Sequence, residues 1–480
     1  MSSLAKKTIS GATLTLVSSV ATALTQAVIL VILARLLSPV DYGRFAIATI
    51  ASRFTIGIAN GVLERALLTS EKIPQSLNPI APFILSAVVA IICSIGALFL
   101  ISERGNDVFM AVCIIQLAAL PVSLSLTTRV ALRRDLNLKP IVISEYMGQL
   151  LGLGLTTITL AALGLGVVSL AIGSLVQGIC QAAIIFAAKR PSFATPLRLS
   201  AMAVTVRESL LILPNALLEV AFVQLPSIIV GWRLGVESLG LFTRIYSLVQ
   251  LPIEMVATAI TRVLVSALVQ TRKNVARSKK AVSILITSAS AILLPTVGGL
   301  IGSHEQFIMI VLGSSWSEGS QFSAALMLST CFAVLAHLFA VFSEANAMYI
   351  QKALVQSCAL GIQIITMIAG SESLGLLGAS IGVAVGTFVF LLGNIKITTA
   401  KLSASPRDVY SWLSTGAIAG IANFLVSSMI GDYLIHWSVY WVLTSQIAAC
   451  GVTTAVFLTI FERKRVMLIL EIARGRHAHF

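Results

Sequence analysis

The stretch ARLLSPVDYGRFAIATIASR, residues 34–53, places a proline, an aspartate and a glycine between long apolar segments. A similar stretch, WRLGVESLGLFTRIYSLVQ, follows at residues 232–250. Gly43 of the first stretch and Gly240 of the second lie 197 positions apart. A polar turn of this kind marks the place where one apolar helix ends and the next begins. Its return indicates that the chain contains two copies of one structural unit.

The composition is typical of an integral membrane protein. Hydrophobic residues make up 57% of the chain and charged residues 11%, and the mean hydropathy is +0.97, whereas soluble domains carry about 25% charged residues. A helix of about 20 apolar residues spans a bilayer. We therefore expect an all-α integral membrane protein with about 14 transmembrane helices. The predicted helices cover residues 9–33, 43–63, 80–102, 108–128, 142–163, 166–188, 209–231, 241–264, 281–302, 321–343, 353–371, 374–395, 409–430 and 437–460.

The positions of lysine and arginine predict the orientation in the membrane, because cytoplasmic loops collect these residues. With a cytoplasmic N-terminus and alternating helices, 26 of the 33 lysines and arginines fall on the cytoplasmic side. The N-terminus has the lysines of a secretory signal, Lys6 and Lys7, but apolar character continues to Leu33, so we expect an uncleaved first helix. Both termini are predicted to be cytoplasmic. The net charge of +14 follows from this bias and needs no nucleic acid partner.

A second similarity supports an internal repeat. The stretch LGLGVVSLAIG from Leu163 and the stretch LGLLGASIGVA from Leu374 align Gly164 with Gly375. Helices 1 to 6 and 7 to 12 are therefore predicted to be copies with the same orientation, related by a pseudo-twofold axis along the membrane normal. The expected domains are an N-terminal six-helix lobe (1–190), a cytoplasmic linker (191–208), a C-terminal six-helix lobe (209–400), two additional helices (401–461) and a basic cytoplasmic tail (462–480).

Sequence motifs of enzymes are missing. The chain has no GxxxxGK phosphate loop, no HExxH zinc motif and no GxSxG nucleophile motif. None of the six cysteines forms a CxxC pair. The longest predicted outer loop, residues 303–320, is too short to form a typical extracytoplasmic active site. We therefore expect no enzyme activity, no cofactor and no metal site.

Three stretches carry a resemblance to a known family: ARLLSPVDYGRFAIA at residues 34–48, LRRDLNLKP at 132–140 and GWRLGVESLGLFTRIYSLVQLP at 231–252. With them the chain resembles the Wzx-type polysaccharide flippases of the multidrug/oligosaccharidyl-lipid/polysaccharide exporter superfamily. The resemblance implies two six-helix lobes in a V around a central cavity and two additional helices. It also implies translocation of lipid-linked sugars by alternating access, with helices 1, 2, 7 and 8 bordering the cavity.

A cavity that faces water leaves polar stripes at helical spacing. Three of the four bordering helices show such a stripe, but in helix 209–231 Gln224 lies opposite Asn215 on an ideal helix. The stripes contain Thr15, Ser18, Thr22, Thr25 and Gln26 in helix 1, Arg53, Gly57, Asn60, Gly61 and Glu64 in helix 2, and Arg244, Ser247, Gln250, Glu254, Thr258, Thr261 and Arg262 in helix 8.

Charged side chains at the centre of a membrane helix cost about 2.5 to 3.5 kcal/mol on insertion scales, so they need compensation. They either pair with each other or face a hydrated cavity. In the second case arginine suits an anionic diphosphate, because it is permanently charged and donates two parallel hydrogen bonds. The predicted substrate-binding residues are Arg53, Arg262, Gln26, Asn60 and Gln250, and the predicted ion-coupling residues are Glu254 and Glu219. Arg244 is expected to be solvated.

The residues and the resemblance together predict a flippase of the bacterial inner membrane. It is expected to move undecaprenyl-diphosphate-linked oligosaccharide outward for exopolysaccharide, capsule or O-antigen assembly. The expected partners are this lipid-linked oligosaccharide, membrane lipids and other polysaccharide assembly proteins. Two alternatives stay open: a cation-coupled multidrug exporter of the same superfamily, and a membrane polysaccharide polymerase or ligase.

Overall fold

The structure is a computed structural model and describes residues 21–69, 78–100, 106–191, 199–271, 275–346, 348–434 and 436–461. Within these ranges the chain is helical, with short turns and no β-strand. Each of the predicted apolar segments overlaps a described helix. Nine helices in these ranges are long and apolar enough to cross a membrane. The prediction of an all-α, multi-pass membrane protein is therefore confirmed.

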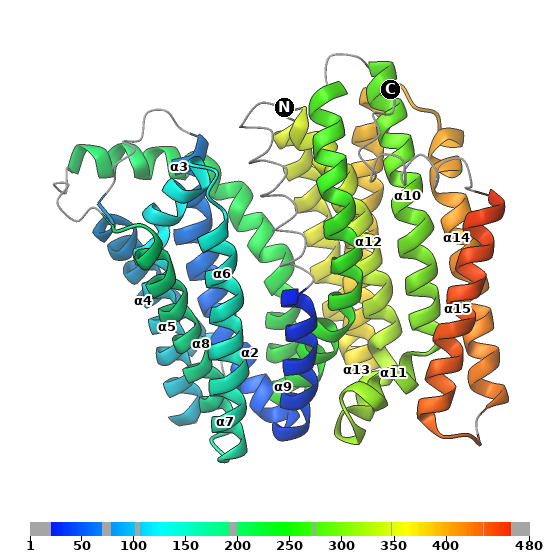
Figure 1. The fold of residues 1–480 in the computed structure, drawn as a ribbon, viewed down its shortest axis with the longest axis horizontal. Coiled ribbons are helices and arrows are strands. Elements are labelled where there is room, and N and C mark those ends of the chain that lie inside the picture. Colours follow the sequence, from blue (N-terminus) through cyan, green and yellow to red (C-terminus); the bar gives the residue numbers. More distant parts are fainter. Residues whose placement is uncertain are drawn as a thin grey trace. The chain divides into compact units, whose positions relative to one another are not determined.

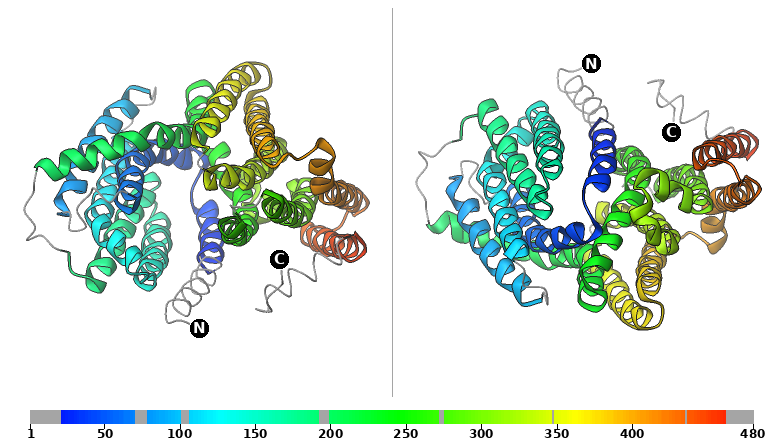
Figure 2. Two further views of the ribbon diagram at one scale, coloured as in Figure 1. Left: turned by 90° about the horizontal axis from the view of Figure 1, so that it is seen from above. Right: turned by 90° about the horizontal axis from the view of Figure 1, so that it is seen from below.

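The chain divides into two compact units, Met1–Arg244 and Ile245–Phe480. In unit 1, α5 packs against α2, α4 and α8, and α8 packs against α6 and η2. Figure 1 shows α4, α5, α6 and α8 running side by side, and Figure 2 shows the helices of residues 80–188 end-on in one bundle. The elements are the helical segment Ala21–Leu36, α2 (Pro39–Thr55), the π-helix η1 (Ile56–Gly61), α3 (Val62–Thr69), α4 (Ile80–Leu100), α5 (Asn106–Arg134), α6 (Lys139–Gly148), the π-helix η2 (Gln149–Thr156), α7 (Thr157–Ala162), α8 (Val167–Ala188) and the first part of α9 (Leu199–Thr271).

In unit 2, α10 packs against α12, α14 and α15, and α12 packs against α13. The segment 303–320, predicted as an outer loop, contains α11 and a 3-10 helix. The elements are the rest of α9, α10 (Val275–Gly302), α11 (His304–Val311), the 3-10 helix η3 (Ser314–Gly319), α12 (Ser320–Ala345), α13 (Tyr349–Leu402), α14 (Pro406–Tyr433) and α15 (Val439–Phe461).

Two of these helices each contain two predicted transmembrane segments. α9 is interrupted at Gly235, where φ is 85°, and α13 is interrupted at Gly375, where φ is 58°. Residues with a side chain rarely adopt these backbone angles, so glycine is the residue that permits the break. Gly164, the predicted counterpart of Gly375, also has a positive φ, of 82°. Gly166, two residues further on, matches Gly375 in both angles: its φ and ψ are 50° and −130°, against 58° and −131°.

The polar turn at residues 34–43 is a helix start. Ser38 caps α2: its Oγ accepts a hydrogen bond from the Asp41 backbone N–H at 3.2 Å, and Asp41 accepts one from the Ser38 backbone N–H at 3.1 Å. Pro39 occupies the first helical position, where its missing N–H costs nothing. The same Ser-Pro-x-Asp pattern caps α14 at Ser405. These reciprocal bonds satisfy backbone groups that would otherwise be unpaired at the start of a helix.

The two copies of the repeated turn pack directly against each other in unit 1. A Cβ atom on Gly43 would lie 1.9 Å from the carbonyl oxygen of Val236, and a Cβ on Gly240 would lie 1.8 Å from that of Pro39. Each glycine therefore lets the backbone of its own copy approach the backbone of the other. Small residues permit this kind of close helix crossing in membrane proteins. The crossing explains why both copies carry a glycine at this position.

Arg244 adds a polar contact near this crossing. Its side chain donates a hydrogen bond to the carbonyl oxygen of Leu30, and its guanidinium carbon lies 4.3 Å from the centre of the Tyr42 ring. Arg244 is 9% exposed, so the expectation that it is solvated was wrong. The carbonyl acceptor and the aromatic face replace water around the charge, and the residue ties α9 to both Ala21–Leu36 and α2.

A buried amide performs a similar role in unit 2. Asn423 of α14 donates hydrogen bonds to the carbonyl oxygen of Pro295 in α10 at 3.0 Å and to the hydroxyl of Thr454 in α15 at 2.9 Å. Gln446 of α15 donates to the carbonyl oxygen of Ser427 at 2.9 Å. A pocket of about 450 Å³ lies beside these residues. Each amide forms a hydrogen bond to a neighbouring helix, and these bonds hold α10, α14 and α15 together.

The glycine crossing predicts a stability effect. Gly240→Ala should lower the free energy of unfolding by about 1 to 3 kcal/mol, because the added methyl group meets backbone that cannot rotate away. Gly361→Ala is the matched control, since no atom lies within 4 Å of its Cβ position. Thermal unfolding of both purified variants in detergent measures the difference. Equal unfolding temperatures for the two variants would contradict the crossing.

Candidate functional site

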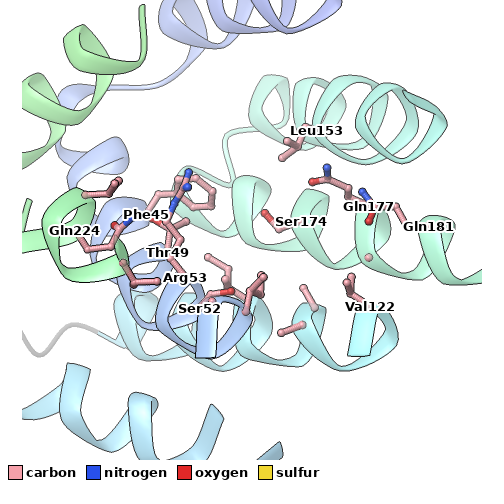
Figure 3. Close-up of a pocket in the computed structure, with 18 of the residues that line it drawn as sticks. Phe45, Thr49, Ser52, Arg53, Val122, Leu153, Ser174, Gln177, Gln181 and Gln224 are labelled. Atoms are coloured by element: carbon pink, nitrogen blue, oxygen red, sulfur yellow. The ribbon is translucent and has the colours of Figure 1, made fainter. Parts of the chain in front are cut away.

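Unit 1 contains a pocket of about 690 Å³, and its lining combines apolar side chains with polar and charged ones. Its walls come from α2 and η1, α5, η2, α8 and the first part of α9. Figure 3 shows Thr49, Ser52 and Arg53 on one side and Ser174, Gln177 and Gln181 of α8 on the other. The polar and charged lining residues are Thr49, Ser52, Arg53, Arg129, Ser174, Gln177, Gln181, Glu219 and Gln224. The volume lies within the range of about 300 to 1,000 Å³ that small ligands occupy in proteins.

Two of the predicted site residues meet in this pocket. Arg53 comes from the last turn of α2 and is exposed, and Glu219 comes from α9. Glu219 also accepts a hydrogen bond from Arg65 of α3 at 2.9 Å. The Arg65 and Glu219 side chains are 54% and 34% exposed. The charge of Glu219 is therefore compensated by an arginine that the sequence did not link to it.

Gln224 lines the same pocket as Glu219, although an ideal helix places it opposite Asn215. The pocket follows a broad face of α9, and Val220 and Val223 fill the space between the two polar residues. Glu219 and Gln224 lie at the two edges of this face, separated by about 140° at 100° per residue. Gln224 therefore shares the pocket with Glu219, whereas Asn215 does not line it.

The predicted stripe of helix 2 is divided by the π-helix η1. Arg53 and Gly57 line the pocket, whereas Asn60 is buried outside it and Glu64 pairs with Arg133 of α5 at 2.9 Å. A π-helix has a wider turn than an α-helix and changes the direction of the side chains after it. The side-chain pattern therefore follows α-helical spacing only as far as Gly57.

The remaining predicted residues lie elsewhere. Gln26 is exposed on Ala21–Leu36 and does not line this pocket, and Gln250 belongs to unit 2. Arg262 and Glu254 lie on α9, but their side chains are outside the described residues. These predictions stay predictions.

Arg129 of α5 is a pocket residue that the sequence analysis missed. It was counted among the basic residues of a cytoplasmic segment, but it lines the pocket together with Gln177 and Gln181 of α8. Arg129 Nη2 lies 3.3 Å from Gln181 Oε1, and Nη1 lies 3.8 Å from a carboxylate oxygen of Glu145. The signal was present in α8, because Ser174, Gln177 and Gln181 follow one another at steps of three and four.

A profile of the polysaccharide biosynthesis proteins matches residues 32–321, which include every residue of the pocket. The chain belongs to this family. The resemblance that the turns carried is thereby confirmed. No curated protein matches the sequence.

Solved structures show the same fold at low sequence identity. The lipid II flippase MurJ in an inward closed conformation matches with a TM-score of 0.75 and 14% identity, over 94% of this chain and 99% of that chain. An inward-facing multidrug resistance MATE family transporter of the MOP superfamily matches with a TM-score of 0.56 and 18% identity, over 80% and 94%. A Vibrio cholerae MATE transporter matches at 0.56 and 12%, over 85% and 99%. The polysaccharide biosynthesis protein therefore has a membrane transporter fold.

The Arg65–Glu219 contact can be tested by exchanging the charges. Arg65→Glu or Glu219→Arg alone places like charges together and should lower the free energy of unfolding by up to about 1 kcal/mol, the usual range for an exposed pair. The double exchange should recover both stability and polysaccharide output in cells that lack the native protein. If Glu219 instead binds a coupling cation, the double exchange will restore stability and leave polysaccharide output low.

Proposed function

We propose that this protein is a flippase for undecaprenyl-diphosphate-linked oligosaccharide in the bacterial inner membrane. It moves the glycan from the cytoplasmic to the periplasmic leaflet by alternating access, for exopolysaccharide, capsule or O-antigen assembly. The observation that carries the proposal is the pocket in unit 1, in which Arg53 lies among glutamines and hydroxyl groups. Membership of a polysaccharide biosynthesis family supports a glycan as cargo.

The chemistry of the pocket fits the two polar parts of such a cargo. Guanidinium groups bind phosphate oxygens through charge-assisted hydrogen bonds, which are about twice as strong as neutral ones. Amide side chains both donate and accept hydrogen bonds, so they match sugar hydroxyls. MurJ, which has this fold, is a lipid II flippase, so the fold is compatible with the movement of a lipid-linked cargo. The long apolar tail of the cargo needs no pocket, because it can stay in the surrounding lipid.

In this proposal Arg53 contacts the diphosphate, and Arg262, Gln26, Asn60 and Gln250 are further substrate contacts along the path. Glu254 is the candidate for ion coupling. Glu219 is the other candidate, although its pairing with Arg65 at 2.9 Å favours a structural role. An intramembrane carboxylate that binds a proton or a sodium ion would couple transport to an ion gradient.

The leaflet distribution of lipid-linked oligosaccharide tests the proposal. After depletion of the protein the glycan should accumulate in the inner leaflet, and expression of the wild type should restore its export. Arg53→Gln should reduce export by about tenfold or more, as expected for the loss of one charge-assisted hydrogen bond of 1.5 to 3 kcal/mol. Arg133→Gln is the control, because Arg133 pairs with Glu64 and does not line the pocket.

An unchanged leaflet distribution after depletion would contradict the flippase assignment. Sensitivity of the depleted cells to cationic dyes, with normal surface glycan, would point to the multidrug exporter instead.

A further inference from the structure

Arg129 has an incompletely compensated charge. Its side chain is 12% exposed, and the nearest carboxylate, Glu145, is 49% exposed and 3.8 Å away. Its Nε atom is buried without a hydrogen-bond partner among the described residues. A guanidinium group that has lost most of its water, and whose ion-pair partner at 3.8 Å is half exposed, can exchange that partner for an anion that binds it directly.

The two glutamines beside Arg129 are held by close helix packing. A Cβ on Gly148 would lie 2.8 Å from Gln181 Cγ, and a Cβ on Gly152 would lie 2.5 Å from the backbone nitrogen of Gln177. On the opposite side of α8, a Cβ on Gly178 would lie 2.4 Å from the carbonyl oxygen of Ala118 in α5. α8 therefore packs closely against η2 on one side and α5 on the other. A rigid support of this kind is what a selective binding site needs.

We propose that Arg129, Gln177 and Gln181 form a subsite for an acidic sugar of the cargo, a hexose that carries a carboxylate. Arg129 binds the carboxylate, and the two glutamines bind neighbouring hydroxyl groups. The proposal rests on the proposed function and names its substrate class: a lipid-linked oligosaccharide with at least one uronic acid.

The surroundings of Arg129 favour a carboxylate over the diphosphate. Arg129 has one positive charge and is 12% exposed, so it compensates one carboxylate, whereas a diphosphate would leave a second negative charge uncompensated beside Glu145. Gln181 already accepts a hydrogen bond from Arg129 at 3.3 Å, so its side chain lies beside the guanidinium group. One cation with two adjacent amides matches one carboxylate with its ring hydroxyls.

Binding of two matched ligands to the full chain in lipid nanodiscs tests the subsite. Both ligands are short-chain isoprenyl diphosphates that carry a disaccharide, and they differ only at the terminal sugar, which is glucuronic acid in one and glucose in the other. The wild type should bind the acidic ligand about tenfold more tightly. Arg129→Gln should remove this preference and leave the affinity for the neutral ligand within about threefold.

Two further variants separate the subsite from a folding defect. Arg133 lies one turn after Arg129 on α5 and outside the pocket, so Arg133→Gln should keep the preference for the acidic ligand. Glu145→Gln removes the carboxylate that competes for Arg129, so it should tighten binding of the acidic ligand by a few fold. A misfolded protein cannot produce this gain.

The outcomes distinguish the two proposals. If Arg129→Gln lowers the affinity for both ligands equally, the subsite is overturned and Arg129 belongs at the diphosphate. An unchanged preference in Arg129→Gln would also overturn it. If the wild type binds neither ligand, the proposed function itself fails, and the subsite fails with it.

Discussion

The backbone approach at Gly43 and Gly240 positions the walls of the pocket in unit 1. α2 and α9 meet where each glycine faces a carbonyl oxygen of the other copy, and a side chain at either position would separate them. A second close approach follows at Gly57, whose Cβ would lie 2.6 Å from Val220. Arg53 lies between these contacts on α2. The direction of its side chain therefore depends on glycines that have no polar chemistry of their own.

Charges in the pocket are compensated from the helices around it. Glu219 pairs with Arg65, and Arg129 is shared between Gln181 and Glu145. Each of these contacts leaves one partner partly exposed, so none is a closed, dry ion pair of the kind that resists exchange. Such partly satisfied groups can exchange a protein partner for a ligand. A transporter needs this property, because its cargo must leave the site after it has bound.

The fold could be predicted from the sequence because its signals are local or repeated. Apolar segment length predicted the helices, and the repeated glycines Gly43 and Gly240 predicted a shared structural role. In the long segments 209–264 and 353–395 the two predicted helices follow each other directly, joined at a kink where Gly235 or Gly375 has a positive φ. Composition has no signal for this kink.

The site was harder to predict, for three physical reasons. The π-helix η1 changes the side-chain direction after Gly57, so α-helical spacing does not show that Asn60 lies outside the lining of this pocket. Charge counting assigned Arg129 to a cytoplasmic segment, because a single sequence does not show which end of a helix is covered by its neighbours. Arg244 was misassigned for the same reason, since its acceptor, the carbonyl oxygen of Leu30, lies 214 positions away in the sequence.

Photo-crosslinking from the pocket tests the central claim, that cargo passes through unit 1, most directly. A benzophenone amino acid replaces Ser174 in the pocket or, as a control, Ile292 on the exposed face of α10. After irradiation of living cells, the account predicts a covalent adduct with lipid-linked oligosaccharide from position 174 and none from position 292. Equal adducts from both positions, or adducts with lipid alone from position 174, would contradict it.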